Sequence, residues 1–147
     1  MTPCSYIDGK GVVILGATSS MARAAAIEFA RGGYHVVTAA RDAEENALVA
    51  ADVAVRSGGH AEAVTLDAED FASHGAFLEE CRLRLNDRIE GVVLCFGCLD
   101  EQARCQEDFG VAHRTIDVNY TGAVSLLERF AAHFEGRRSG FIAAVGS

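Results

Sequence analysis

The chain has 147 residues, of which 50% are hydrophobic and 23% charged, with a formal net charge of −8. This length suits one domain with one core, and the balance excludes an intrinsically disordered chain. An acidic chain without a basic run is a poor nucleic-acid binder, and no apolar stretch approaches the roughly 18 residues of a membrane span. Residues 1–10 hold no apolar signal core. We therefore expect a single cytoplasmic domain over residues 1–147.

Short apolar runs alternate with amphipathic segments along the chain. A continuous run such as 12–15 suits a strand that is buried on both faces, and glycine pairs follow the first two helical segments. In chain order, we expect a strand at 12–15, a helix at 20–31, a strand at 35–39, a helix at 42–57, a strand at 62–66, a helix at 71–85, a strand at 89–95, a helix at 111–134 and a strand at 141–145. The alternation predicts an α/β fold, namely a Rossmann-like doubly wound parallel sheet truncated after its fifth strand.

Apolar residues in two of these helices are spaced to form stripes that should face the core. The long helix carries Ile116, Tyr120, Ala123, Leu127, Phe130 and Phe134. The helix at 71–85 carries Phe71, Leu78, Cys81 and Leu85. The five histidines show no such order, so we expect them at the surface or at strand edges.

The turn between the first strand and the first helix consists of small residues. It reads Gly16-Ala17-Thr18-Ser19-Ser20-Met21-Ala22. In dinucleotide-binding folds, backbone N–H groups at this helix N-terminus face the pyrophosphate, and small residues let it approach. Of the three glycines usual in such a loop only Gly16 is present, with Ser20 and Ala22 at the other two positions. A tightly packed turn without a ligand is therefore the alternative.

The second strand ends in Ala40-Arg41. An acid at this strand end would bind the 2′-hydroxyl of an adenosine ribose, whereas an arginine suits a 2′-phosphate. The residues therefore favour NADP(H), with NAD(H) possible. A solvated arginine at a strand end is the alternative.

Two further strand ends carry residues suited to the same groove. Asp67-Ala68 follows the third strand, where an aspartate can reach the adenine edge, although it can equally cap the next helix. The fourth strand closes with Cys95-Phe96-Gly97, and a glycine there permits close backbone approach.

Taken in order, these residues resemble the short-chain dehydrogenase/reductase superfamily from Gly11 onward. The matching positions are Gly16 to Ala22, Arg41, Asp67, Gly97, Asn119 and Ser147. The resemblance implies an NAD(P)(H)-dependent oxidoreductase that acts on a carbonyl or hydroxyl group of a small molecule. It further implies that Asn119, in an Asn-x-x-Gly element, holds a proton-relay water, and that Ser147 orients the substrate oxygen. The family also implies a homo-oligomer through helix 111–134.

Besides Ser20 and Ala22 in the phosphate loop, the chain departs from the family pattern at two further places. Leu94-Cys95-Phe96-Gly97 replaces the family's Asn-Asn-Ala-Gly. The phrases Cys95-Phe96-Gly97 and Asn119-Tyr120-Thr121 are most similar to reductases of polyprenyl-phosphate-linked keto-pentoses. The family's catalytic Tyr-x-x-x-Lys pair is absent, because Lys10 is the single lysine and no tyrosine precedes a lysine by four residues. We therefore expect an N-terminal fragment of such an enzyme that is inactive alone. A non-catalytic dinucleotide-binding module or a gene fragment is the alternative.

The five cysteines are expected to be reduced thiols. Cys95 and Cys98 form a CxxC, but the pair follows a strand instead of opening a helix, where the helix dipole would stabilise a thiolate. A zinc site would need two more ligands, and no second spaced pair exists. We therefore expect neither a redox dithiol nor a metal.

Overall fold

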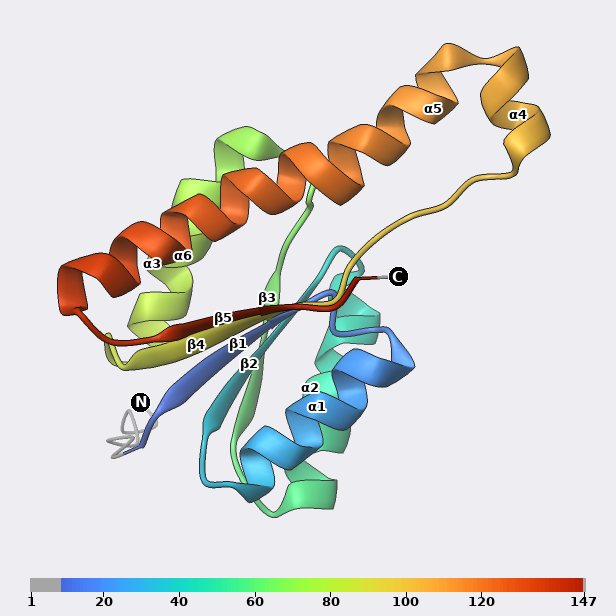
Figure 1. Cartoon of the computed structure of the whole chain (residues 1–147). Coiled ribbons are helices and arrows are strands. Elements are labelled where there is room, and N and C mark those ends of the chain that lie inside the picture. The colour runs from blue at the N-terminus through green and yellow to red at the C-terminus, as the bar shows by residue number, and fades with distance from the viewer. Residues whose placement is uncertain (1–8, 147) are drawn as a thin grey trace.

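The computed structural model describes residues 9–146, in which five strands form one parallel sheet (Figure 1). The strands are β1 (Gly11–Leu15), β2 (His35–Ala40), β3 (Ala61–Thr65), β4 (Ile89–Leu94) and β5 (Phe141–Ala144). Their order across the sheet is β3-β2-β1-β4-β5, so the direction of strand addition reverses between β1 and β4. The predicted Rossmann-like doubly wound sheet is confirmed, and each strand begins and ends within one residue of its prediction.

Helices cover both faces of this sheet. Figure 1 shows α1 (Ser20–Arg31) and α2 (Ala43–Ser57) on one face, and α3 (His74–Arg84) and α6 (Ala123–Arg137) on the other. Successive residues of β1 pack into the two opposite layers, with Val12 and Ile14 on the α1 side and Val13 and Leu15 on the α6 side. This burial on both faces explains why β1 is a continuous apolar run. No helix within residues 9–146 has the length and apolarity needed to cross a bilayer.

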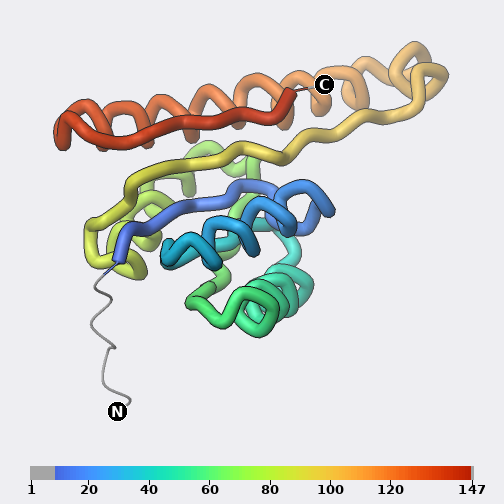
Figure 2. Tube along the Cα trace, turned by 60° about the horizontal axis from the view of Figure 1, so that its bottom comes forward, coloured from blue at the N-terminus to red at the C-terminus, as the bar shows by residue number. Residues whose placement is uncertain are grey.

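Between β4 and β5 the chain forms a long helical arm. It comprises α4 (Gln102–Glu107), α5 (Phe109–Ile116), a π-helical turn η2 (Asp117–Gly122) and α6. Figure 2 shows that the arm runs alongside β5 and that its α4–α5 end extends beyond the sheet. The sequence analysis missed α4 because this helix has six residues and none of them is buried, so it carries no apolar periodicity.

The π-helical turn changes which residues of the arm face the core. The buried residues are spaced by four: Val118, Gly122, Leu126, Phe130 and Phe134. The predicted core stripe is therefore wrong at its start, where Ile116 is 52% and Tyr120 is 69% exposed. Hydrogen bonds from i to i+5 insert an extra residue into the turn, and a stripe cannot be extrapolated through that change of phase.

A short 3-10 turn, η1 (Phe71–Ser73), precedes α3 and changes its buried face. Phe71 is exposed, contrary to the predicted stripe, whereas His74 and Phe77 are buried together with Cys81 and Leu85. The expectation of surface histidines is wrong for His74, which is fully buried.

Candidate functional site

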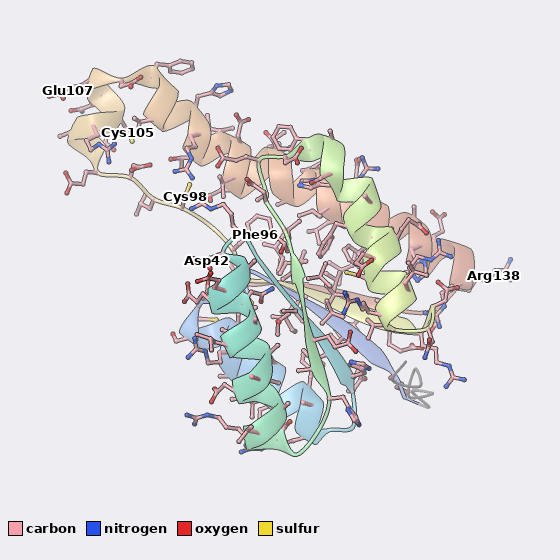
Figure 3. The ribbon with its side chains drawn as sticks, turned by 180° about the vertical axis from the view of Figure 1, so that it is seen from behind. Asp42, Phe96, Cys98, Cys105, Glu107 and Arg138 are labelled. Atoms are coloured by element: carbon pink, nitrogen blue, oxygen red, sulfur yellow. The ribbon has the colours of Figure 1, made fainter. Side chains whose placement is uncertain are left out.

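A cavity of about 180 Å³ lies at the carboxyl ends of β1 to β4, where the strand order reverses. In open α/β sheets this is the place where ligands bind. Figure 3 shows Phe96 and Cys98 on the segment that leaves β4, and Asp42 at the start of α2. The cavity is lined by Gly16, Thr18, Ala39, Ala40, Arg41, Leu66, Asp67, Ala68, Glu69, Phe96, Gly97, Cys98, Arg114 and Val118.

Glycine is required where β1 ends. Gly16 has φ +82°, and a Cβ there would lie 2.6 Å from the backbone nitrogen of Phe96. The N–H groups of Gly16 and Ala17 both donate to the carbonyl of Ala39, at 2.8 and 3.0 Å. The turn after β1 is thus pressed between the ends of β2 and β4, and a side chain at residue 16 would separate them.

The N-terminus of α1 opens directly after this turn. Ser19 is the N-cap, with φ −70° and ψ 149°, and its hydroxyl accepts from the N–H of Ala22 at 3.2 Å. No acidic residue lies in the first turn of α1, so the partial positive charge of the helix end is not neutralised there. Thr18 lines the cavity, whereas the side chains of Ser19, Ser20 and Met21 do not.

The loop after β3 is held by a buried histidine. The Asp67 carboxylate accepts from the N–H of Glu69 at 2.9 Å, and the Asp67 carbonyl oxygen lies 2.9 Å from Nε2 of His74. A carbonyl only accepts, so Nε2 donates to it, and Nδ1 pairs with the Ser125 hydroxyl, 2.9 Å away. His74 therefore joins Asp67 to α6. The sequence analysis missed it, because a lone histidine shows no periodic signal.

Three charged residues lie at the mouth of the cavity. Nε of Arg114 is 3.1 Å from both carboxylate oxygens of Glu69, and a guanidinium nitrogen of Arg41 is 4.0 Å from one of them. The hydrogen bond to Glu69 raises the pKa of Arg114. Arg41 thus lies where the sequence predicts it, at the end of β2 beside the cavity.

The Asn-x-x-Gly element lies in the π-helical turn and touches two of the strand-end loops. Nδ2 of Asn119 donates to the carbonyl of Cys98 at 2.7 Å, and its Oδ1 accepts from the Cys98 N–H at 2.7 Å. Gly122 packs directly against the carbonyl oxygen of Ala68, where a Cβ would clash. The turn therefore fixes the segment after β4 against the loop after β3.

This geometry agrees with the comparison with known families. The family model for short chain dehydrogenases matches residues 10–147. The chain belongs to the short chain dehydrogenase family.

Relatives of this short chain dehydrogenase are named as oxidoreductases. An uncharacterized oxidoreductase of Mycobacterium tuberculosis strain H37Rv is 36% identical over 123 residues, which are 82% of this chain and 48% of the relative. The protein of strain CDC 1551 gives the same figures. The chain thus spans about half the length of the curated relatives it matches.

Solved structures superpose closely on the chain. A short-chain type dehydrogenase/reductase from Mycobacterium marinum gives a TM-score of 0.86 at 25% identity, covering 96% of this chain and 57% of that one. A variant of the actinorhodin polyketide ketoreductase with NADPH gives a TM-score of 0.87 at 19% identity, covering 95% and 54%. The second likeness shows the fold.

Five predicted site residues within the described part of the chain do not line the cavity: Ser19, Ser20, Met21, Cys95 and Asn119. Cys95 follows β4 but packs into the layer of α1, and burial raises the pKa of its thiol, which disfavours the reactive thiolate. Ser147 lies outside the described residues. The cavity adds Glu69, Arg114 and Val118, which the sequence analysis did not single out, and Cys98, which it considered only as part of a CxxC.

Proposed function

We propose that the chain forms the cofactor-binding half of an NADP(H)-dependent oxidoreductase that acts on a carbonyl or hydroxyl group. The observation that carries this proposal is the cavity at the strand-order reversal, which has the open N-terminus of α1 on one side and Arg41 on the other. The N-terminus of α1 favours an anion such as the pyrophosphate, and Arg41 favours a phosphate. The family and the oxidoreductase relatives support the class of reaction.

Within this proposal each part of the cavity has a role. The backbone N–H groups of residues 18–21 bind the pyrophosphate, Arg41 binds the 2′-phosphate, and Asp67 and Ala68 contact the adenine. Phe96 and Gly97 line the path toward the nicotinamide, which supplies the hydride when the cofactor is bound. By family resemblance, Asn119 holds a proton-relay water through the helix backbone, and Ser147 orients the substrate oxygen.

A second candidate is a dinucleotide-binding module without catalysis. It is favoured by the sequence, in which none of the three tyrosines precedes a lysine by four residues. General acid–base catalysis contributes about 10² to 10⁴ in rate, so we expect this chain to bind cofactor without reducing ketones. NADPH consumption by the purified 147-residue chain with a panel of ketones would contradict this expectation and would remove the second candidate.

Cofactor binding is tested by titrating the chain with NADPH and NADH in a calorimeter. We expect NADPH to bind more tightly, and Arg41→Ala to weaken NADPH by about tenfold while NADH is unchanged, because a charged hydrogen bond contributes about 1.5–3 kcal/mol. Arg31→Ala is the matched control, since Arg31 is an exposed, ion-paired arginine outside the cavity. Equal loss of both cofactors in Arg41→Ala would remove the NADP(H) assignment, and no binding of either would remove the proposed function.

We also propose that a second copy of the chain packs on the outer face of the helical arm. This face carries three exposed apolar residues spaced by four, Ile116, Tyr120 and Val124. Exposed apolar surface favours association with another chain. The family resemblance supports the same helix as the contact.

A further inference from the structure

Glu69 lies between two arginines that line the same cavity. Arg41 directly follows β2, Glu69 belongs to the loop after β3, and Arg114 reaches the cavity from α5. The carboxylate is 3.1 Å from Arg114 and 4.0 Å from Arg41. Three segments that are distant in sequence thus bring two positively charged side chains and one negatively charged side chain to the mouth of the cavity.

The anion between these arginines belongs to the protein itself. Guanidinium groups bind carboxylates and phosphates with the same geometry, so an oxyanion of either kind fits between them. Glu69 supplies one negative charge against two positive charges. A phosphate monoester carries about −1.5 to −2 at pH 7, so it matches the two arginines better than one carboxylate does.

The neighbouring carboxylates are already engaged. Asp67 accepts from the N–H of Glu69, and Asp42 accepts from the N–H of Glu45 as the cap of α2. Arg114 therefore has Glu69 as its partner here, and a ligand phosphate has to compete with that one carboxylate.

We propose that Arg114 is a second specificity-determining residue for the 2′-phosphate, and that Glu69 is the internal counter-anion which the phosphate displaces. This inference rests on the proposed function and deepens it. On binding, the Arg114–Glu69 ion pair opens and Arg114 joins Arg41 on the phosphate. The displaced carboxylate of Glu69 remains near the bound phosphate and repels it. Glu69 therefore weakens binding of the phosphorylated cofactor and leaves binding of the unphosphorylated cofactor unaffected.

The test compares two adenosine ligands that differ in the 2′-phosphate. Adenosine 2′,5′-bisphosphate and AMP are titrated into the 147-residue chain and into the variants Arg114→Gln and Glu69→Gln. We expect Arg114→Gln to weaken the bisphosphate by about tenfold and AMP by less than about twofold. Glu69→Gln, which preserves size but removes the charge, should tighten the bisphosphate by about threefold and leave AMP unchanged.

Arg104→Gln is the matched control. Arg104 pairs with Asp100 at 3.3 Å on the same helical arm, but it does not line the cavity. Thermal melts establish that each variant is folded. The conservative variant Arg114→Lys retains the charge but lacks the planar guanidinium that can make two parallel hydrogen bonds. It should recover part of the bisphosphate affinity.

Equal weakening of both ligands by Arg114→Gln would overturn the inference, because Arg114 would then only shape the cavity. Weaker AMP binding in Glu69→Gln would also overturn it, because Glu69 would then bind the ribose hydroxyls. If the unaltered chain bound neither ligand and no NADPH, the proposed function itself would fall. Tight binding of both ligands with no response to either variant would overturn the inference alone.

Discussion

The side-chain amide of Asn119 bonds the backbone of Cys98 on both sides. It donates to the Cys98 carbonyl and accepts from the Cys98 N–H, each at 2.7 Å. A residue whose N–H and carbonyl are both held in this way cannot shift along the turn, so the segment that leaves β4 has a fixed position against the cavity. The π-helical turn is what turns the Asn119 side chain toward that segment, while Gly122 of the same turn packs on Ala68.

Replacing Asn119 should therefore loosen the segment after β4. We expect Asn119→Ala to lower the free energy of unfolding by about 1 kcal/mol, since two hydrogen bonds are lost at a largely exposed site. Asn119→Asp should be at least as destabilising, because its carboxylate faces the Cys98 carbonyl and cannot donate. Urea unfolding measures both, with Thr121→Ala as a control in the same turn. A stable Asp variant would show that the two bonds do not hold the segment.

Gly16 gives a second prediction, which separates steric clash from backbone strain. Gly16→Ala places a Cβ against the Phe96 backbone in a left-handed conformation, whereas Gly33→Ala has a similar φ of +87° with nothing within 4 Å. We expect about 1 kcal/mol of destabilisation for Gly33→Ala and about 3 kcal/mol or more for Gly16→Ala. Equal losses in urea unfolding would mean that the close approach to Phe96 is unimportant.

The sequence predicts the sheet well because burial on both faces leaves a local signal. The apolar run of β1 and the glycine stops after α1 and α2 require no knowledge of distant residues. The same holds for Gly16 and Arg41, whose place at a strand end follows from the order of the elements. Both line the cavity.

The helical arm could not be predicted in the same way, because its features depend on contacts between distant residues. The π-helical turn is a change of hydrogen-bond pattern with no propensity signature, and it moves Ile116 and Tyr120 from the expected core to the surface. Glu69 and Arg114 are 45 residues apart in sequence, so their pairing depends on how the arm lies over the sheet. The role of His74 could not be predicted either, because its two hydrogen-bond partners lie on different elements, namely the loop after β3 and α6.

His74 should be essential for the loop after β3. His74→Phe retains an aromatic ring but leaves the Asp67 carbonyl and the Ser125 hydroxyl without their partner, which costs about 1–3 kcal/mol. Ser125→Ala removes one of the two bonds and should cost about 1 kcal/mol. The double variant should lose less than the sum of the two, because both act on one chain of hydrogen bonds. Additive losses would contradict this coupling.

His35 makes stability depend on pH. Burial lowers its pKa, with His60 adding to the effect and Glu62 opposing it. A histidine whose folded pKa lies below the unfolded value of about 6.5 binds its proton more readily in the unfolded chain, so its contribution is complete above about pH 6.5 and is lost as the pH falls below it. We expect His35→Leu to reduce the loss of unfolding free energy between pH 8 and pH 5.5. An unchanged loss would place the pH dependence on other groups.

The outer face of the arm gives the last prediction. If a second copy covers Ile116, Tyr120 and Val124, then Tyr120→Arg adds a charge to the centre of that contact and should convert dimers to monomers. Light scattering after size-exclusion chromatography measures this. Leu48→Arg, at an exposed position of α2, makes the same change of charge away from the arm and tests whether charge alone acts. A chain that is monomeric before any substitution would remove the proposed contact. Retained NADPH binding in a monomeric Tyr120→Arg variant would show that the cavity is complete within one copy.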